Sequence, residues 1–158
     1  MPNQSSNLLR RLIEEVINQG HLEMMTLLVH PDYVDHDVYP GEPEGTRESL
    51  TAFFAELRAA LPDLRFEPLQ DETVDGDQIW GRYMASGTMT GGPLFGQPPT
   101  RRFARWREIH WVRVDSATGL IIEHFGAGAD LDMLAELGLQ APQPPSEFSD
   151  QRTIPGAL

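Results

Sequence analysis

Residues 78–114 read QIWGRYMASGTMTGGPLFGQPPTRRFARWREIHWVRV, and their alternating pattern is the clearest indication of the fold class. Large side chains recur every second residue over 78–90 and again over 101–114, which predicts two long β-strands. The Gly- and Pro-rich residues 91–100 between them predict a loop. We therefore expect a long hairpin at the centre of an antiparallel sheet.

The sequence on both sides of this hairpin predicts more extended chain. Leu64 and Phe66 begin a strand, and Asp75-Gly76 is typical of a tight hairpin turn. Residues 115–119 predict another turn and residues 120–125 a last strand. An earlier segment, residues 33–39, is also expected to be extended. The result is a four-stranded meander with one additional extended segment.

The first 60 residues instead follow the period of amphipathic helices. Ser5 or Ser6 can cap a first helix, a short second helix covers residues 22–28, and Thr46 caps a third that ends at Ala60. A closing helix is expected from Asp130 to Leu137. Helices followed by a meander, with no βαβ alternation, predict an α+β fold. We expect a curved antiparallel sheet packed against three N-terminal helices as a cone that encloses a pocket.

Composition narrows the class of protein. The 158 residues form one expected domain, 1–138, and a Pro-rich tail, 139–158. The chain has no cysteine, which excludes disulfides and thiolate chemistry. Its net charge of −12 argues against nucleic-acid partners. No signal peptide and no apolar run of ~20 residues is seen, so we expect a cytoplasmic protein without membrane contact. Arg101, Arg105 and Arg107 share one strand face, predicted to be solvated.

Several short motifs occur in an order that is typical of one family. They are Tyr33-Val34-Asp35-His36-Asp37, Glu44-Gly45-Thr46, residues 57–64, Asp75-Gly76-Asp77, residues 87–91, residues 96–100, Ile122-Glu123-His124-Phe125 and Glu136-Leu137-Gly138. Together, over about residues 8–138, they resemble the SnoaL-like polyketide cyclases of the nuclear transport factor 2-like superfamily. The resemblance implies a cone-shaped barrel, a homodimer formed through the outer sheet face, and cofactor-free aldol closure of a polyketide ester.

Two positions depart from the family pattern. The family's acid/base aspartate usually lies nine residues before the glycine of the final Leu-Gly, and counting back from Gly138 gives Ala129. Either Asp130, one residue further on, takes this role, or the acid is absent. Met89 stands where a histidine is common in the family.

Aldol chemistry needs a base for a C–H proton and a donor for the developing alkoxide. We predict Asp130, His110 and His36 as catalytic, with Asp130 and His110 on one pocket wall and His110 orienting the acid or protonating the alkoxide. The alternatives are a solvent- or dimer-facing His110 and a His36 that only hydrogen-bonds its neighbours. Asp35, His36 and Asp37 lack the spacing of a metal site, so no metal or cofactor is expected.

A small apolar or aromatic substrate needs a lining of flat and flexible side chains. We predict that the lining is formed by Trp80, Arg82, Met84, Trp106, His124, Phe54 and Tyr39. Arg82 can hold a carboxylate or carbonyl group. The alternative is that the apolar members are core residues and that Arg82 forms an ion pair on the outer face.

The predicted function is a cofactor-free cyclase that acts on a small apolar carbonyl compound by acid/base chemistry. Two alternatives remain open: a non-catalytic module that binds a small molecule in the same cone, and a hydrolase or dehydratase that uses carboxylate-activated water. A homodimer packed through the outer sheet face is expected, because Trp106, Ile109 or Trp111 would otherwise be exposed.

Overall fold

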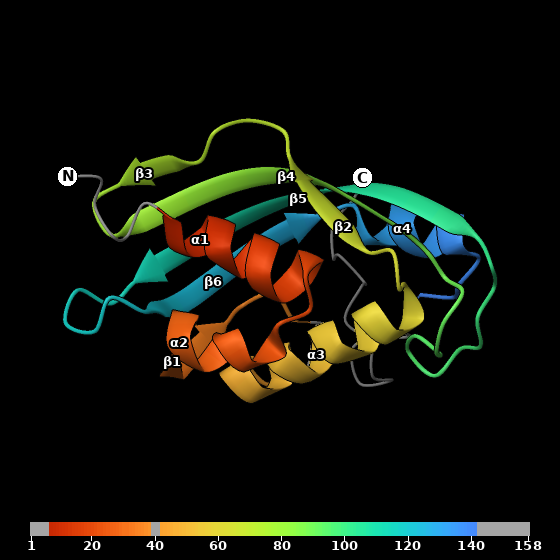
Figure 1. Ribbon diagram of the computed structural model, residues 1–158, viewed down its shortest axis with the longest axis horizontal. Helices are drawn as coiled ribbons and strands as arrows, with labels where there is room; N and C mark the ends of the chain where they lie inside the picture. The colour runs from red at the N-terminus through yellow and green to blue at the C-terminus, as the bar shows by residue number, and fades with distance from the viewer. Residues whose placement is uncertain (1–6, 39–41, 142–158) are drawn as a thin grey trace, which may run out of the picture.

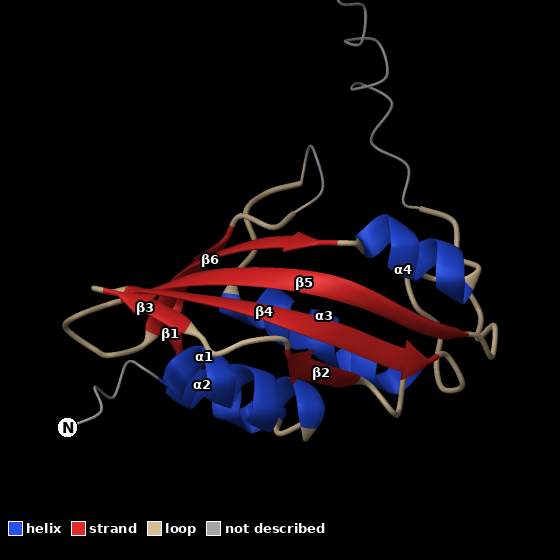
Figure 2. Cartoon of the chain, turned by 90° about the horizontal axis from the view of Figure 1, so that it is seen from above, coloured by secondary structure: helices blue, strands red, loops and turns tan. Residues whose placement is uncertain are grey.

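The computed structural model describes residues 7–38 and 42–141. In chain order the elements are α1 (Leu8–Arg11), η2 (Leu12–Asn18), η3 (Leu22–Met24), α2 (Met25–Leu28), β1 (Val29–Asp35), α3 (Arg47–Ala60), β2 (Arg65–Pro68), β3 (Thr73–Asp75), β4 (Gln78–Thr88), β5 (Phe103–Val114), β6 (Ile121–Gly128) and α4 (Asp130–Leu137). The first predicted helix is thus one continuous element whose second part, η2, is π-helical. Figures 1 and 2 show the curved sheet with α1, α2 and α3 against one face. The α+β fold is as predicted.

The sheet is built around the predicted hairpin. Its strand order is β1-β6-β5-β4-β2, with β3 also paired to β4. β4 and β5 are antiparallel in continuous register, from Gln78 opposite Arg113 to Thr88 opposite Phe103. The predicted turn at Asp75-Gly76 is present, with Gly76 at a φ of +61° that favours glycine.

The prediction of a purely antiparallel sheet was wrong at one edge. β1 runs parallel to β6, so that Val34 lies opposite Glu123 and Asp35 opposite His124. The sheet is therefore mixed. The two paired segments are nearly ninety positions apart in the chain, and no local turn sets their relative direction, so the sequence pattern carries no information about it.

The third helix and the closing helix follow the expected local signals. Thr46 and Ser49 form a reciprocal capping box at the start of α3, whose buried residues are Phe54, Leu57 and Ala60. α4 ends at Gly138, which adopts the left-handed conformation (φ 75°). The predicted cap at Ser5 or Ser6, the predicted substrate contact Tyr39 and residues 142–158 of the tail lie outside the described residues.

The two faces of β5 differ sharply. Ala104, Trp106 and Val112 are buried towards the helices, whereas Phe103 and Ile109 on the other face are 57% and 41% exposed. The exposed arginines of this strand also lie on the outer face, as predicted. Within residues 7–38 and 42–141, no helix is long and apolar enough to span a membrane.

Candidate functional site

A cavity of about 630 Å³ lies between the inner face of the sheet and helices α3 and α4. A volume of this size accommodates a drug-sized organic molecule. The apolar part of its wall consists of Val38, Leu50, Phe53, Phe54, Leu57, Phe66, Phe95, Trp106 and Met133. The polar part consists of Asp35, Asp37, Glu42, Ser49, Glu108, His110, His124 and Asp130, together with the backbone at Gly45. No lysine or arginine is among these lining residues.

Five of the predicted site residues line this cavity: Phe54, Trp106, His110, His124 and Asp130. The three predicted residues on β4 do not line the cavity, so the predicted orientation of this strand was wrong. Trp80, Arg82 and Met84 point to the outer face of the sheet, and Trp80 is 46% exposed. The buried positions of β4 are the alternate ones, among them Ile79, Tyr83 and Ala85. Both faces of this strand carry large side chains, so the period of two did not reveal which one faces inwards.

His36 also lies away from the cavity. Its Nε2 contacts Glu123 Oε1 at 2.8 Å and its Nδ1 contacts Glu44 Oε1 at 3.1 Å. The ring stacks on Phe125 with a centroid distance of 4.2 Å. The hydrogen bond from His36 lowers the pKa of the Glu123 carboxyl. His36 was predicted as catalytic, but it belongs to a polar and aromatic cluster and is not among the residues that line the cavity.

A chain of buried hydrogen bonds starts at Asp35 on the parallel strand β1. Asp35 Oδ1 lies 2.8 Å from His124 Nδ1, and Oδ2 accepts a hydrogen bond from the Tyr33 hydroxyl at 2.8 Å. The backbone N–H of Asp37 donates to Oδ1 as well. Burial raises the pKa of Asp35, but these hydrogen bonds outweigh it and the net pKa is lowered. Asp35 is therefore an ionised carboxylate inside the protein.

The chain continues from His124 to His110. His124 Nε2 lies 3.0 Å from His110 Nδ1, and the two rings are stacked with centroids 5.2 Å apart. Burial lowers the pKa of His110 to about 3, and the electrostatic effect of the neighbouring His124 is the second largest cause. His110 is therefore neutral near pH 7. A neutral imidazole is a much weaker proton donor than an imidazolium ion, which argues against His110 as the group that protonates the alkoxide.

A pair of carboxyl groups forms the second polar feature of the cavity. Burial and the nearby Asp130 charge raise the pKa of Glu108 to about 8, even though the indole N–H of Trp106 donates to its Oε1 at 2.5 Å. Burial likewise raises the pKa of Asp130, whereas its hydrogen bond to Glu108 acts in the opposite direction. Near pH 7 the pair therefore holds one proton, mainly on Glu108, while Asp130 is the ionised partner.

Two glycines of β6 make room for these acids. A Cβ atom on Gly128 would lie 2.1 Å from Glu108 Oε2, and one on Gly126 would lie 2.3 Å from Asp37 Oδ2. Both glycines lie on the same strand face as His124, at the second and fourth residues after it. Asp37 also lines the cavity, and partial burial of its carboxyl raises the pKa of that group. Any side chain larger than glycine at these positions would displace the carboxylates from the cavity wall.

Sequence reasoning missed Glu108 and the paired role of Asp35. A glutamate next to an arginine in an alternating strand is typical of a solvated face. Glu108 was therefore not predicted as a pocket residue, although Trp106 and His110 on the same strand were. The signal that could have found Glu108 is the run Gly126-Ala127-Gly128 on the neighbouring strand, because alternating glycines mark a close approach of other groups. Among the residues that the structure describes, no group of three or more histidine and acidic side chains is arranged to hold a metal ion.

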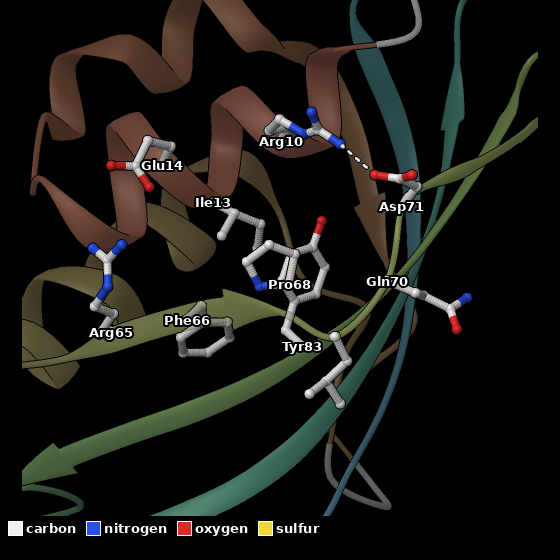
Figure 3. A pocket seen from close by; sticks show the side chains of 10 residues that line it. Arg10, Ile13, Glu14, Arg65, Phe66, Pro68, Gln70, Asp71 and Tyr83 are labelled. Atoms are coloured by element: carbon white, nitrogen blue, oxygen red, sulfur yellow. Dashed lines mark ion pairs between the residues drawn. The ribbon is translucent and has the colours of Figure 1, made fainter.

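A second cavity, of about 650 Å³, lies between the first helix and the β2–β3 segment (Figure 3). Arg10 and Asp71 form an ion pair at 4.0 Å across its rim, where both side chains are exposed. Phe66 lines this cavity as well as the first one, and Tyr83 forms part of its wall. Its polar groups comprise both acids and bases without a converging set, so the first cavity is the better candidate for chemistry.

Comparison with known proteins agrees with this geometry. The sequence matches the family described as SnoaL-like polyketide cyclase over residues 7–137. IdmH from Streptomyces antibioticus, a candidate polyketide cyclase, is 30% identical, with a TM-score of 0.70 and coverage of 87% of this chain and 100% of IdmH.

Two more distant structures show the same fold. TsrD from Streptomyces laurentii is 21% identical, with a TM-score of 0.74 and coverage of 89% and 98% of the two chains. AclR from Streptomyces galilaeus, a candidate hydroxylase, is 20% identical, with a TM-score of 0.72 and coverage of 92% and 87%. No curated protein matches the sequence.

Proposed function

Because this chain belongs to the SnoaL-like polyketide cyclase family, we propose that it closes a ring in a neutral polyketide-type carbonyl compound by an intramolecular aldol reaction. The observation that carries the proposal is the Glu108–Asp130 pair in an aromatic-lined cavity. One member of the pair is an ionised base and the other is a neutral acid at the same pH, which is what this reaction requires.

In the proposed reaction Asp130 acts as the base and Glu108 as the acid. The Asp130 carboxylate removes a proton from the acidic carbon between two carbonyl groups, and the resulting carbanion attacks a second carbonyl carbon of the same molecule. One C–C bond forms, and the Glu108 carboxyl gives its proton to the developing alkoxide. Transfer of the new proton from Asp130 to Glu108, through their hydrogen bond, restores the starting state. No atom is gained or lost, so the step is an isomerisation.

The charge of the cavity wall supports a neutral substrate. Five of the lining residues carry carboxyl groups and none is a lysine or arginine. A substrate with a free carboxylate would meet repulsion in a site of low dielectric constant. An ester or ketone avoids this cost, and the aromatic rings from α3, β2 and the loop before β5 can pack against its flat faces.

The proposal can be tested without knowing the natural substrate. Neutral aryl-substituted 1,3-diketones exchange the proton between their carbonyls for deuterium, and NMR follows that exchange in D₂O. The protein should accelerate it, and Asp130→Asn should reduce the acceleration by at least about a hundredfold. Asp132→Asn, an exposed aspartate of the same helix, is the matched control and should leave it unchanged.

Two results would count against the proposal. Equal rates for the wild type and Asp130→Asn would remove Asp130 as the base. Saturable binding of diketones without any acceleration of exchange would favour the non-catalytic binding module instead.

A further inference from the structure

His110 carries a nitrogen whose hydrogen-bonding capacity the structure does not use. Its Nε2 atom is fully covered and has no hydrogen-bond partner among the described residues. The side chain nevertheless lines the first cavity, the one that contains Glu108 and Asp130, and keeps some accessible surface. Buried polar atoms in native proteins are nearly always paired, so an unpaired one beside a ligand-sized cavity calls for a functional account.

The hydrogen-bond chain that ends at His110 decides what kind of partner this nitrogen can take. The Asp35 carboxylate accepts only, so His124 must donate to it from Nδ1. When His124 Nε2 acts as the acceptor of the next hydrogen bond in the chain, His110 donates to it from Nδ1. The proton of the neutral His110 ring is thereby placed on Nδ1, which leaves Nε2 as a hydrogen-bond acceptor. The opposite arrangement would bury an N–H donor without an acceptor, which is rare in proteins.

We propose that His110 Nε2 is an acceptor subsite beside the cavity, held in that form by Asp35 and His124, and that it selects ligands bearing a phenol or enol hydroxyl. This rests on the proposed function of the cavity and specifies the substrate class further. Asp35 and His124 are positioning residues, because they act only through His110. The rings of Tyr83 and Phe66 are centred 5.7 Å and 6.1 Å from that of His110. Because Nε2 is covered, a ligand hydroxyl reaches it only when the side chains around this atom shift.

The first test reads the tautomer directly. In protein labelled with ¹⁵N at histidine, NMR distinguishes protonated from unprotonated ring nitrogens. We expect His110 to carry its proton on Nδ1 at pH 7 and to remain neutral down to at least pH 5. In His124→Leu the acceptor for that proton is lost, and the proton should move to Nε2. A wild-type ring protonated at Nε2, or at both nitrogens, would overturn the proposal whether or not the variant folds.

The second test measures ligand preference with 2-naphthol and its methyl ether, 2-methoxynaphthalene. The naphthol should bind the wild type about threefold to tenfold more tightly, as expected for one net hydrogen bond. This preference should disappear in His110→Phe and persist in Asp130→Asn, which would exclude the Asp130 carboxylate as its source. Equal affinities in the wild type, or loss of the preference in Asp130→Asn alone, would refute the subsite.

The tests of the His110 subsite can fail or succeed independently of the tests of the proposed cyclase function. Neither the tautomer nor the binding preference requires turnover, so a protein that fails to accelerate diketone exchange can still show both. Conversely, exchange that depends on Asp130 in a protein without the naphthol preference would retain the cyclase proposal and remove the subsite alone.

Discussion

Replacing Glu108 by glutamine should stabilise the protein at neutral and alkaline pH while removing its acid. The folded protein raises the pKa of Glu108 from 4.5 to about 8. A carboxyl whose pKa is raised on folding favours the folded state fully below its unfolded pKa, and that contribution is lost as pH rises towards the folded pKa. Between pH 4.5 and 8, therefore, Glu108 progressively lowers the free energy of unfolding.

The size of the effect follows from the two pKa values. At 1.36 kcal/mol per pH unit, the loss reaches an upper bound of about 5 kcal/mol above pH 8 and about 3 kcal/mol at pH 7. Glutamine resembles the neutral carboxyl in shape, and its amide oxygen can still accept from the Trp106 indole. Glutamine cannot ionise, so the free energy of unfolding of Glu108→Gln should not fall in this way as pH rises.

Urea unfolding of both proteins at pH 4.5, 7 and 8.5 measures this difference. The two free energies of unfolding should be nearly equal at pH 4.5, and the variant should become increasingly more stable as pH rises. A variant that is less stable than the wild type by the same amount at all three pH values would refute the reasoning, because it would show that folding does not raise the pKa of Glu108.

Three further predictions concern activity, the glycine positions and assembly. The kcat/KM for a neutral cyclisable substrate should fall as pH rises through about 8, where Glu108 loses its proton; a profile that is flat to pH 10 would exclude Glu108 as the acid. Gly128→Ala should lower the free energy of unfolding by about 1–3 kcal/mol and reduce activity, because its methyl group displaces the Glu108 carboxyl. Gly92→Ala, where the nearest atom to a new Cβ is 3.7 Å away, is the matched control in the same urea assay, and equal losses would contradict the argument. We propose a homodimer through the outer sheet face, where Trp80 and Ile109 are 46% and 41% exposed; sedimentation should show a dimer at micromolar concentration that dissociates in the double variant Trp80→Ser, Ile109→Ser, and a monomeric wild type would exclude it.

The sequence predicted the positions of the helices and strands better than it predicted which face of each strand points towards the core. The central hairpin, the helix after Thr46 and the helix from Asp130 to Leu137 follow local signals of period, caps and turns. The inner face of β5 did not, because Trp106 and Trp111 place an indole on each side of the strand. Orientation there depends on which face the helices cover, and that is a property of the whole chain.

The candidate site was predicted in part for the same reason. Asp130 was predicted as catalytic from the family resemblance and His110 from its place on the neighbouring strand, and both line the cavity. Glu108 was missed because a glutamate next to Arg107 in an alternating strand normally faces water. Asp35 was missed because its contact with His124 depends on a parallel pairing that leaves no local pattern in the sequence.

The parallel pairing of β1 with β6 also has a kinetic consequence. Asp35 and His124 lie opposite each other on paired strands, β1 and β6, which are far apart in the sequence. Contacts between residues so distant in sequence carry a large loop-closure entropy and tend to form late in folding. The hydrogen-bond chain that lines the cavity is thus completed only when the first strand docks on the last. A ligand that binds there should slow the release of β1, and native-state hydrogen exchange would detect this as protection of the β1 amides that depends on ligand concentration.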